Sequence, residues 1–149
     1  MRDVLQLDVE GPYDIKDPGN TPSRDRILIC KPSHSLSETA CARKILTSLA
    51  GTAYRRPVTE ADVAPLMKVY DTNRQGADFE HGVEAGVEAV LVSPQFLFVQ
   101  ETDPKGSVPG SVHQISDLEL ASRLSFFLWS SLPDQQLLKV AERGQVVIS

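Results

Sequence analysis

The sequence is poor in the residues that most often carry metal or redox chemistry. Its 149 residues include only two cysteines, Cys30 and Cys41, which form neither a C-x-x-C pair nor the C-x-x-C-H motif of covalent haem attachment. The three histidines, His34, His81 and His113, lie in separate segments without metal-ligand spacing. We therefore expect no bound cofactor and no metal site, and we assign the histidines to scattered surface or capping positions.

Long apolar runs and an excess of positive charge are also missing. No run approaches eighteen apolar residues, and acidic residues interrupt positions 1–10, where a signal peptide needs a continuous apolar stretch. Fifteen Lys and Arg against twenty Asp and Glu give a net charge of -5, whereas nucleic acids and anionic membranes attract basic surfaces. We expect no nucleic-acid partner, no membrane insertion and no signal peptide in this chain.

Motifs for nucleophilic, phosphate or calcium chemistry are not found either. The sequence contains no G-x-S-x-G, no glycine-rich phosphate loop and no H-E-x-x-H. Asp14, Asp17 and Asn20 could offer oxygens to calcium, but the EF-hand spacing is absent and turn formation is the simpler role. We assign no catalytic, cofactor-binding or metal-binding residue.

What the sequence does contain is a short β pattern followed by helical patterns. Residues 4–9 alternate in polarity like a half-buried strand, Gly11-Pro12 ends them, and residues 27–30 form a second short apolar run. We predict a mainly α fold, with a short N-terminal β-hairpin followed by helices. Two strands alone are marginal in water, so the hairpin must either pack on those helices or form the edge of a larger sheet.

Helix starts are marked by capping residues. Ser35-x-x-Glu38 predicts a helix that ends near Tyr54, because Pro57 disfavours helical geometry in the residue before it. Thr59-x-x-Asp62 predicts the next helix, whose expected inward residues are Val63, Leu66, Met67 and Tyr70.

Three further boundaries follow from the same reasoning. A turn through Asn73 and Gly76 should lead to Asp78 as the N-cap of a third helix that Ser93-Pro94 ends. After a linker at residues 102–112, Ser116-x-x-Glu119 predicts another helix. Pro133 suits the first turn of a last helix ending at Gly144.

Several clusters invite a functional interpretation beside a simpler one. Glu80, Glu84 and Glu88 recur at i+4, which is typical of a solvated helix edge but would also suit a pair of catalytic carboxylates. Arg55-Arg56 follows a helix end, where cations complement the helix dipole or could clamp a carboxylate ligand. Arg123 has Glu119 four residues before it, which favours an intrahelical or core-edge ion pair. Trp129, with Phe126 and Phe127, is typical of a helix core but could also stack on a sugar.

Seven separated motifs resemble a known family. They are GPY at 11–13, TPSRDRI at 21–27, CKP at 30–32, CAR at 41–43, AYRRPVT at 53–59, LVSPQFLF at 91–98 and DLELASRLSFFLWSSLPD at 117–134. Together they resemble the large secreted, cytochrome-c-linked multidomain proteins of planctomycetes and acidobacteria, which contain helical domains of unknown function.

The resemblance implies a division into three parts: the end of a β module at 1–33, a helical domain of unknown function at 35–101, and the truncated start of a second helical domain at 114–149. It implies a periplasmic or extracellular location, and partners among the missing domains of the parent protein, including a cytochrome c-like domain. We expect a non-catalytic structural or interaction fragment. The alternative is part of an enzyme for redox-linked polysaccharide degradation, with Glu80, Glu84 or Asp117 completing a cleft.

Two structural expectations follow. Cys30 at a strand end and Cys41 in the first turns of a helix, separated by ten residues, can come within disulfide range, and an exported protein meets an oxidising compartment. The helix at residues 118–132 has apolar side chains on more than one face. We therefore expect residues 114–149 to be the least firmly packed part, with Phe126, Phe127 or Trp129 partly exposed, and the protein to self-associate.

Overall fold

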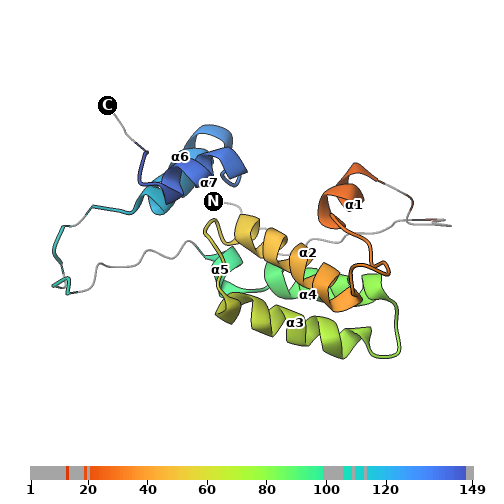
Figure 1. Ribbon diagram of the computed structural model, residues 1–149. Helices are drawn as coiled ribbons and strands as arrows, with labels where there is room; N and C mark the ends of the chain where they lie inside the picture. Colours follow the sequence, from red (N-terminus) through yellow and green to blue (C-terminus); the bar gives the residue numbers. More distant parts are fainter. Residues whose placement is uncertain are drawn as a thin grey trace.

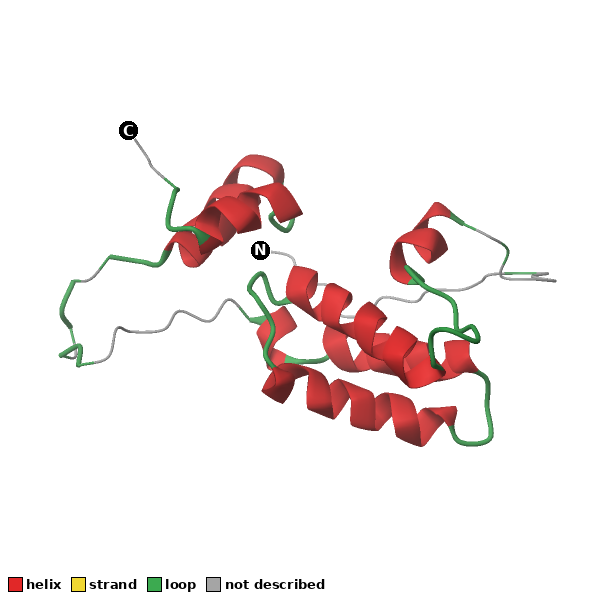
Figure 2. Cartoon of the chain, viewed as in Figure 1, coloured by secondary structure: helices red, strands yellow, loops and turns green. Residues whose placement is uncertain are grey.

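The computed structural model describes residues 13, 19, 21–98, 106–108, 110–112 and 114–146 of the chain. Over these residues the protein is mainly helical and no sheet forms, with one isolated bridge between Ser33 and Leu36 (Figures 1 and 2). None of the described helices is long and apolar enough to cross a membrane. The helices are α1 (Pro22–Ile27), α2 (Glu38–Ala53), α3 (Glu60–Arg74), α4 (Phe79–Leu91), α5 (Pro94–Leu97), α6 (Asp117–Trp129) and α7 (Gln135–Glu142).

The core lies between α2, α3 and α4, which pack side by side (Figure 1). Each of these helices repeats apolar residues at i, i+3 and i+4, so that one face is buried against the other two. All four inward positions predicted for α3 are buried. The buried cluster consists of Cys41, Ala42, Ile45, Leu46, Ala50, Ala53 and Tyr54, then Val63, Leu66, Met67 and Tyr70, and finally Val83 and Val90.

Two glycines let α4 approach its neighbours closely. A Cβ at Gly86 would lie 2.7 Å from a methyl carbon of Leu46 in α2, and a Cβ at Gly82 would lie 2.8 Å from the Tyr70 ring of α3. Both distances are far below carbon–carbon contact, which is about 3.5–4.0 Å. The close spacing of α4 from α2 and α3 therefore requires residues without a Cβ at positions 82 and 86.

Most predicted caps are confirmed. The Thr59–Asp62 and Ser116–Glu119 capping boxes are both present, and the Asp78 carboxylate accepts the His81 amide. The capping box predicted at Ser35 and Glu38 is wrong. Ser37, not Ser35, caps α2, and its side chain accepts a hydrogen bond from the Ala40 amide at 3.2 Å. The reason is that the backbone of residues 33–36 closes a turn upon itself, which leaves residue 37 as the extended residue that a cap requires.

Two other boundaries shift by a few residues. Asn73 lies inside α3, where its side-chain amide donates to the Val69 carbonyl, and the chain turns only at Gly76, with φ of 79°. Pro133 is buried before α7 instead of lying in its first turn, because Asp134 takes the N-cap.

The predicted β-hairpin is not supported. Its first strand, residues 4–9, lies outside the described residues. Its second strand is wrong: Ile27 ends α1, and residues 28–30 are irregular. Thr21 caps α1 by accepting the Arg24 amide at 3.1 Å, and Pro22 suits the first helical turn, so helix-starting chemistry prevails over a short apolar run without a partner strand.

The predicted disulfide is present and links this N-terminal segment to the bundle. Cys30 and Cys41 are bonded, with their Cα atoms 5.9 Å apart. A second link is the ion pair between Arg24 of α1 and Glu80 of α4. Ile27, Leu28 and Leu36 pack against the core as partly buried residues. The segment before α2 is therefore tied to α2 covalently and to α4 electrostatically.

Candidate functional site

The predicted histidine and acidic positions do not form a site. His34 and His81 are exposed, while His113 and the three oxygen donors Asp14, Asp17 and Asn20 lie outside the described residues. Within the described ranges no group of three or more His, Cys, Asp or Glu side chains could hold a metal ion.

The acidic edge of α4 is solvated. Glu80, Glu84 and Glu88 are all exposed, and two of them have basic neighbours: Glu80 pairs with Arg24, and Glu84 lies 3.7 Å from the Nδ1 atom of His81. This arrangement supports the surface interpretation of the three glutamates.

The two consecutive arginines after α2 serve the fold. Arg55 is buried with a left-handed φ of 58°, and its guanidinium donates to the carbonyls of Gln95 and Phe98 at 3.0 Å each. Burial lowers the pKa of Arg55. These bonds fasten the end of α5 to the end of α2, so Arg55 acts on the backbone rather than on a ligand.

The side chain of Arg56 also makes internal contacts. Its guanidinium donates to both carboxylate oxygens of Asp62, at 2.8 and 2.9 Å, and lies 5.8 Å from the centre of the Tyr54 ring. The bonds from Arg56 hold the pKa of the Asp62 carboxyl well below its usual range. Asp62 also caps α3 through Thr59, so the charge pair joins the start of α3 to the end of α2.

Four consecutive large apolar side chains at the end of α6 are exposed, and two of them, Phe127 and Trp129, are the most exposed of the large apolar residues in the described helices. We call the four residues the exposed apolar surface of α6: Phe126 is 40% exposed, Phe127 84%, Leu128 53% and Trp129 64%. The partial exposure predicted for the three aromatic residues is thereby confirmed. Other side chains of α6 are buried. They are Ala121, Ser122 and Ser125, in the helix that packs against α7.

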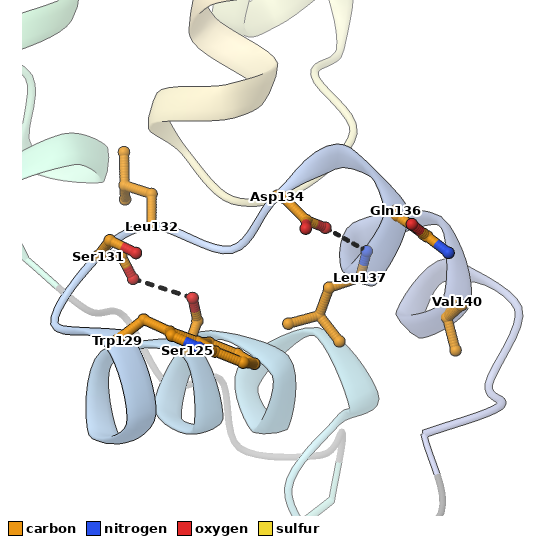
Figure 3. Close-up of a pocket in the computed structure, with 8 residues that line it drawn as sticks. All are labelled: Ser125, Trp129, Ser131, Leu132, Asp134, Gln136, Leu137 and Val140. Atoms are coloured by element: carbon orange, nitrogen blue, oxygen red, sulfur yellow. Dashed lines mark hydrogen bonds between the residues drawn. The ribbon is translucent and has the colours of Figure 1, made fainter.

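The chain reverses between α6 and α7 and leaves a cavity there. Ser130 ends α6 in the left-handed conformation, with φ of 51°, and the buried Ser125 hydroxyl donates to the Ser131 carbonyl at 3.0 Å. The cavity has a volume of about 490 Å³. Its walls come from α6 on one side and from the turn and α7 on the other (Figure 3): Ser125, Trp129, Ser131, Leu132, Asp134, Gln136, Leu137 and Val140.

The cavity combines an aromatic wall with few polar groups. Trp129 supplies the aromatic ring, and Asp134 and Gln136 supply a carboxylate and a carboxamide. One Asp134 oxygen already accepts the Leu137 amide at 2.7 Å as the N-cap of α7. Such a lining can hold a small neutral polar molecule against the indole ring.

Only part of this cavity can be predicted from the sequence. The interpretation of Trp129 as a core residue is wrong, because its side chain is 64% exposed, and its alternative role as a stacking platform stays open. No pattern in the sequence points to Asp134 and Gln136, because their proximity to Trp129 arises only when α7 folds back along α6. The residues proposed for an enzyme lie elsewhere: Glu80 and Glu84 are on α4, and the Asp117 carboxylate accepts the Val146 amide at 2.9 Å.

Comparison with known proteins identifies two segments. Residues 41–101 match the family model of PSD5, a protein of unknown function (DUF1595), and residues 115–147 match that of PSD4, a protein of unknown function (DUF1592). No curated protein and no solved structure matches the chain. The first match begins within α2 and runs past α5, and the second contains α6 and α7. The two segments are thus similar, in this order, to the PSD5 and PSD4 families of unknown function.

Proposed function

We propose that the chain is a non-catalytic structural and interaction module of an exported, cytochrome-c-linked multidomain protein. The observation that carries this proposal is the exposed apolar surface of α6. Four consecutive large apolar side chains are accessible around the end of this helix, and exposed apolar surface of this extent marks a contact site more often than scattered surface leucines do.

Two further observations support the setting. The Cys30–Cys41 disulfide is compatible with an oxidising compartment outside the cytoplasm. The cytochrome linkage rests on the resemblance of the motif-bearing segments, several of which lie inside the matched residues 41–101 and 115–147. The ion-paired arginines of the bundle serve its internal contacts, whereas the apolar side chains at the end of α6 are accessible to a partner.

The test uses the coding sequence on both sides of this chain. We expect the same reading frame to encode C-x-x-C-H haem motifs and further helical segments. Mixing the chain with those segments should shift the emission of Trp129, the only tryptophan, to shorter wavelength as its exposed ring becomes covered. Phe127→Ser should weaken this binding, while Val92→Ser, at another well-exposed apolar residue outside α6, should not. Flanking sequence without haem motifs, or binding that ignores Phe127, would contradict the proposal.

A second candidate function is saccharide binding in the cavity between α6 and α7. The observation that favours it is the Trp129 ring beside Asp134 and Gln136, since sugars stack on aromatic faces and bond to carboxylates and amides. Hydrolysis is less well supported than binding, because glycosidases use two facing carboxylates and Asp134 is the single carboxylate among the described lining residues. Titration with cello- and xylo-oligosaccharides should perturb Trp129 emission in the original chain and leave Gln136→Ala unresponsive.

A further inference from the structure

The cavity between α6 and α7 is lined by one charged group. Its lining residues include Asp134 and no Lys, Arg or His. One oxygen of the Asp134 carboxylate accepts the Leu137 amide, and no ion pair between described residues includes Asp134, which is an exposed residue. A molecule that enters this cavity therefore meets a negative charge that no basic side chain of the described lining neutralises.

The helix ends beside the cavity do not neutralise this charge. α6 ends at Trp129 and α7 begins at Gln135, so the negative end of one helix dipole and the positive end of the other both lie at the turn that joins them. Each end is equivalent to roughly half an elementary charge. Because the two ends have opposite signs, they largely offset each other and leave the Asp134 carboxylate as the net charge of the site.

The Trp129 ring is the second element of the site. It is 64% exposed, and it lies along α6 on the opposite side of the cavity from Asp134 (Figure 3). An indole attracts cations over its face more strongly than other aromatic side chains do, and it also offers an apolar surface to the C–H groups of a sugar ring. The volume of about 490 Å³ lies within the range of small-molecule sites, which is about 300–1,000 Å³. The cavity is therefore complementary to a small ring that carries a cationic group.

We propose that the cavity between α6 and α7 binds an amino sugar, a saccharide whose ring carries a protonated amine. This inference rests on the second candidate function, saccharide binding, and names the class of saccharide. The sugar ring would stack on Trp129, its ammonium group would donate to the second oxygen of Asp134, and a ring hydroxyl would bond to the Gln136 carboxamide. A neutral saccharide would lack the charge-assisted hydrogen bond to Asp134.

The test compares two ligands that differ in one kind of group. The β-1,4-linked trimer of glucosamine has an amine on each ring where cellotriose has a hydroxyl. At about pH 6, where alkyl amines are protonated, both trimers should change the emission of Trp129, the only tryptophan. The glucosamine trimer should bind at least about tenfold more tightly, as expected for one hydrogen bond between charged groups, and added salt should weaken its binding alone. The linear diamine putrescine should bind more weakly than the glucosamine trimer, because it has no ring to stack.

Two variants separate the cavity from the overall charge of the chain. Asn is as good an N-cap as Asp, so Asp134→Asn should keep α7 while removing the charge of the cavity, and the preference for the glucosamine trimer should disappear. Asp78→Asn makes the same exchange at the N-cap of α4, away from the lining residues, and changes the net charge equally. It should bind both trimers like the original chain. Far-UV circular dichroism should be the same for all three proteins.

The outcomes distinguish this inference from the function on which it rests. Equal dissociation constants for the two trimers, or a preference that survives in Asp134→Asn, would overturn the amino sugar and leave saccharide binding standing. An equal loss of affinity in Asp78→Asn, or putrescine binding as tightly as the glucosamine trimer, would show attraction of cations to acidic groups in general and would also overturn the inference. Emission that neither trimer changes would overturn saccharide binding itself.

Discussion

Replacing Gly86 by alanine should destabilise the protein although alanine is the better helix former. The new Cβ would lie 2.7 and 2.9 Å from the two methyl carbons of Leu46, which is fully buried between α2 and α4. Overpacking of this kind costs about 1–3 kcal/mol, and the higher helix propensity of alanine returns about 1 kcal/mol. The net loss in the free energy of unfolding should therefore be about 1 kcal/mol and at most about 2 kcal/mol.

Two matched variants separate the steric effect from propensity. Gly51→Ala changes a helical glycine in α2 whose nearest neighbour would be the Arg56 carbonyl oxygen at 4.0 Å, so it should be neutral or stabilising by up to about 1 kcal/mol. In a Leu46→Ala background the clash is removed, and Gly86→Ala should no longer destabilise.

The assay is urea unfolding followed by far-UV circular dichroism, because the only tryptophan lies in α6 and would report on the other helical unit. If Gly86→Ala costs the same with and without the Leu46 side chain, the close contact between α4 and α2 does not limit the packing, and the reasoning is refuted.

Three further predictions concern covalent, charge and metal chemistry. Denatured, air-oxidised protein should show no reactive thiol, and Cys30→Ser with Cys41→Ser should lower stability by about 3 kcal/mol, as expected for a short closed loop; two free thiols would contradict this. Because the pKa of Asp62 is lowered in the folded state, its contribution should be complete above about pH 5 and lost as the pH falls through about 4 and below. Urea midpoints should consequently drop more steeply with acid in the original chain than in Asp62→Asn, and parallel curves would disprove the linkage. Elemental analysis should find no stoichiometric iron or zinc, and one metal ion per chain would contradict the expectation drawn from the sequence.

Local chemistry explains which helix boundaries could be predicted. The caps at Thr59 and Ser116 depend on two side chains three residues apart, and the cap at Asp78 depends on one side chain that accepts a backbone amide three residues on. All three are present. Ser35 and Ser37 both offer a hydroxyl near the start of α2, and the choice between them depends on the turn that joins Ser33 to Leu36. The turn is held by backbone hydrogen bonds between Ser33 and Leu36, and no pattern of side chains in the sequence predicts them.

The second strand failed for a related reason. The apolar run at residues 27–30 satisfies strand propensity, but a strand also needs a neighbouring strand, and tertiary contacts decide whether one exists. In the structure Ile27, Leu28 and Cys30 pack partly against the buried core of the bundle, and the disulfide links Cys30 to Cys41 of α2. The disulfide itself could be predicted, because its ten-residue separation brings the two cysteines together in either backbone conformation.

Long-range contacts account for what the sequence could not show about the candidate site. The Arg55 guanidinium reaches carbonyls 40 and 43 residues further along the chain, so its role depends on how α5 returns to α2. The cavity beside Trp129 likewise requires α7 to fold back, which brings Asp134 and Gln136 to the indole. The sequence shows that an indole, a carboxylate and a carboxamide are present. Their proximity in space depends on the turn at residues 130–134.

Helix lengths explain why α6 keeps an exposed face. At about 1.5 Å of rise per residue, the 13 residues of α6 and the 8 residues of α7 give helices of roughly 20 and 12 Å. One helix of the shorter length can cover only one side of the longer helix, and it covers the small side chains Ala121, Ser122 and Ser125. Trp129 faces the cavity beside α7, whereas Phe126, Phe127 and Leu128 remain exposed. Part of the apolar surface of α6 is therefore available to a partner that approaches from outside the α6–α7 pair.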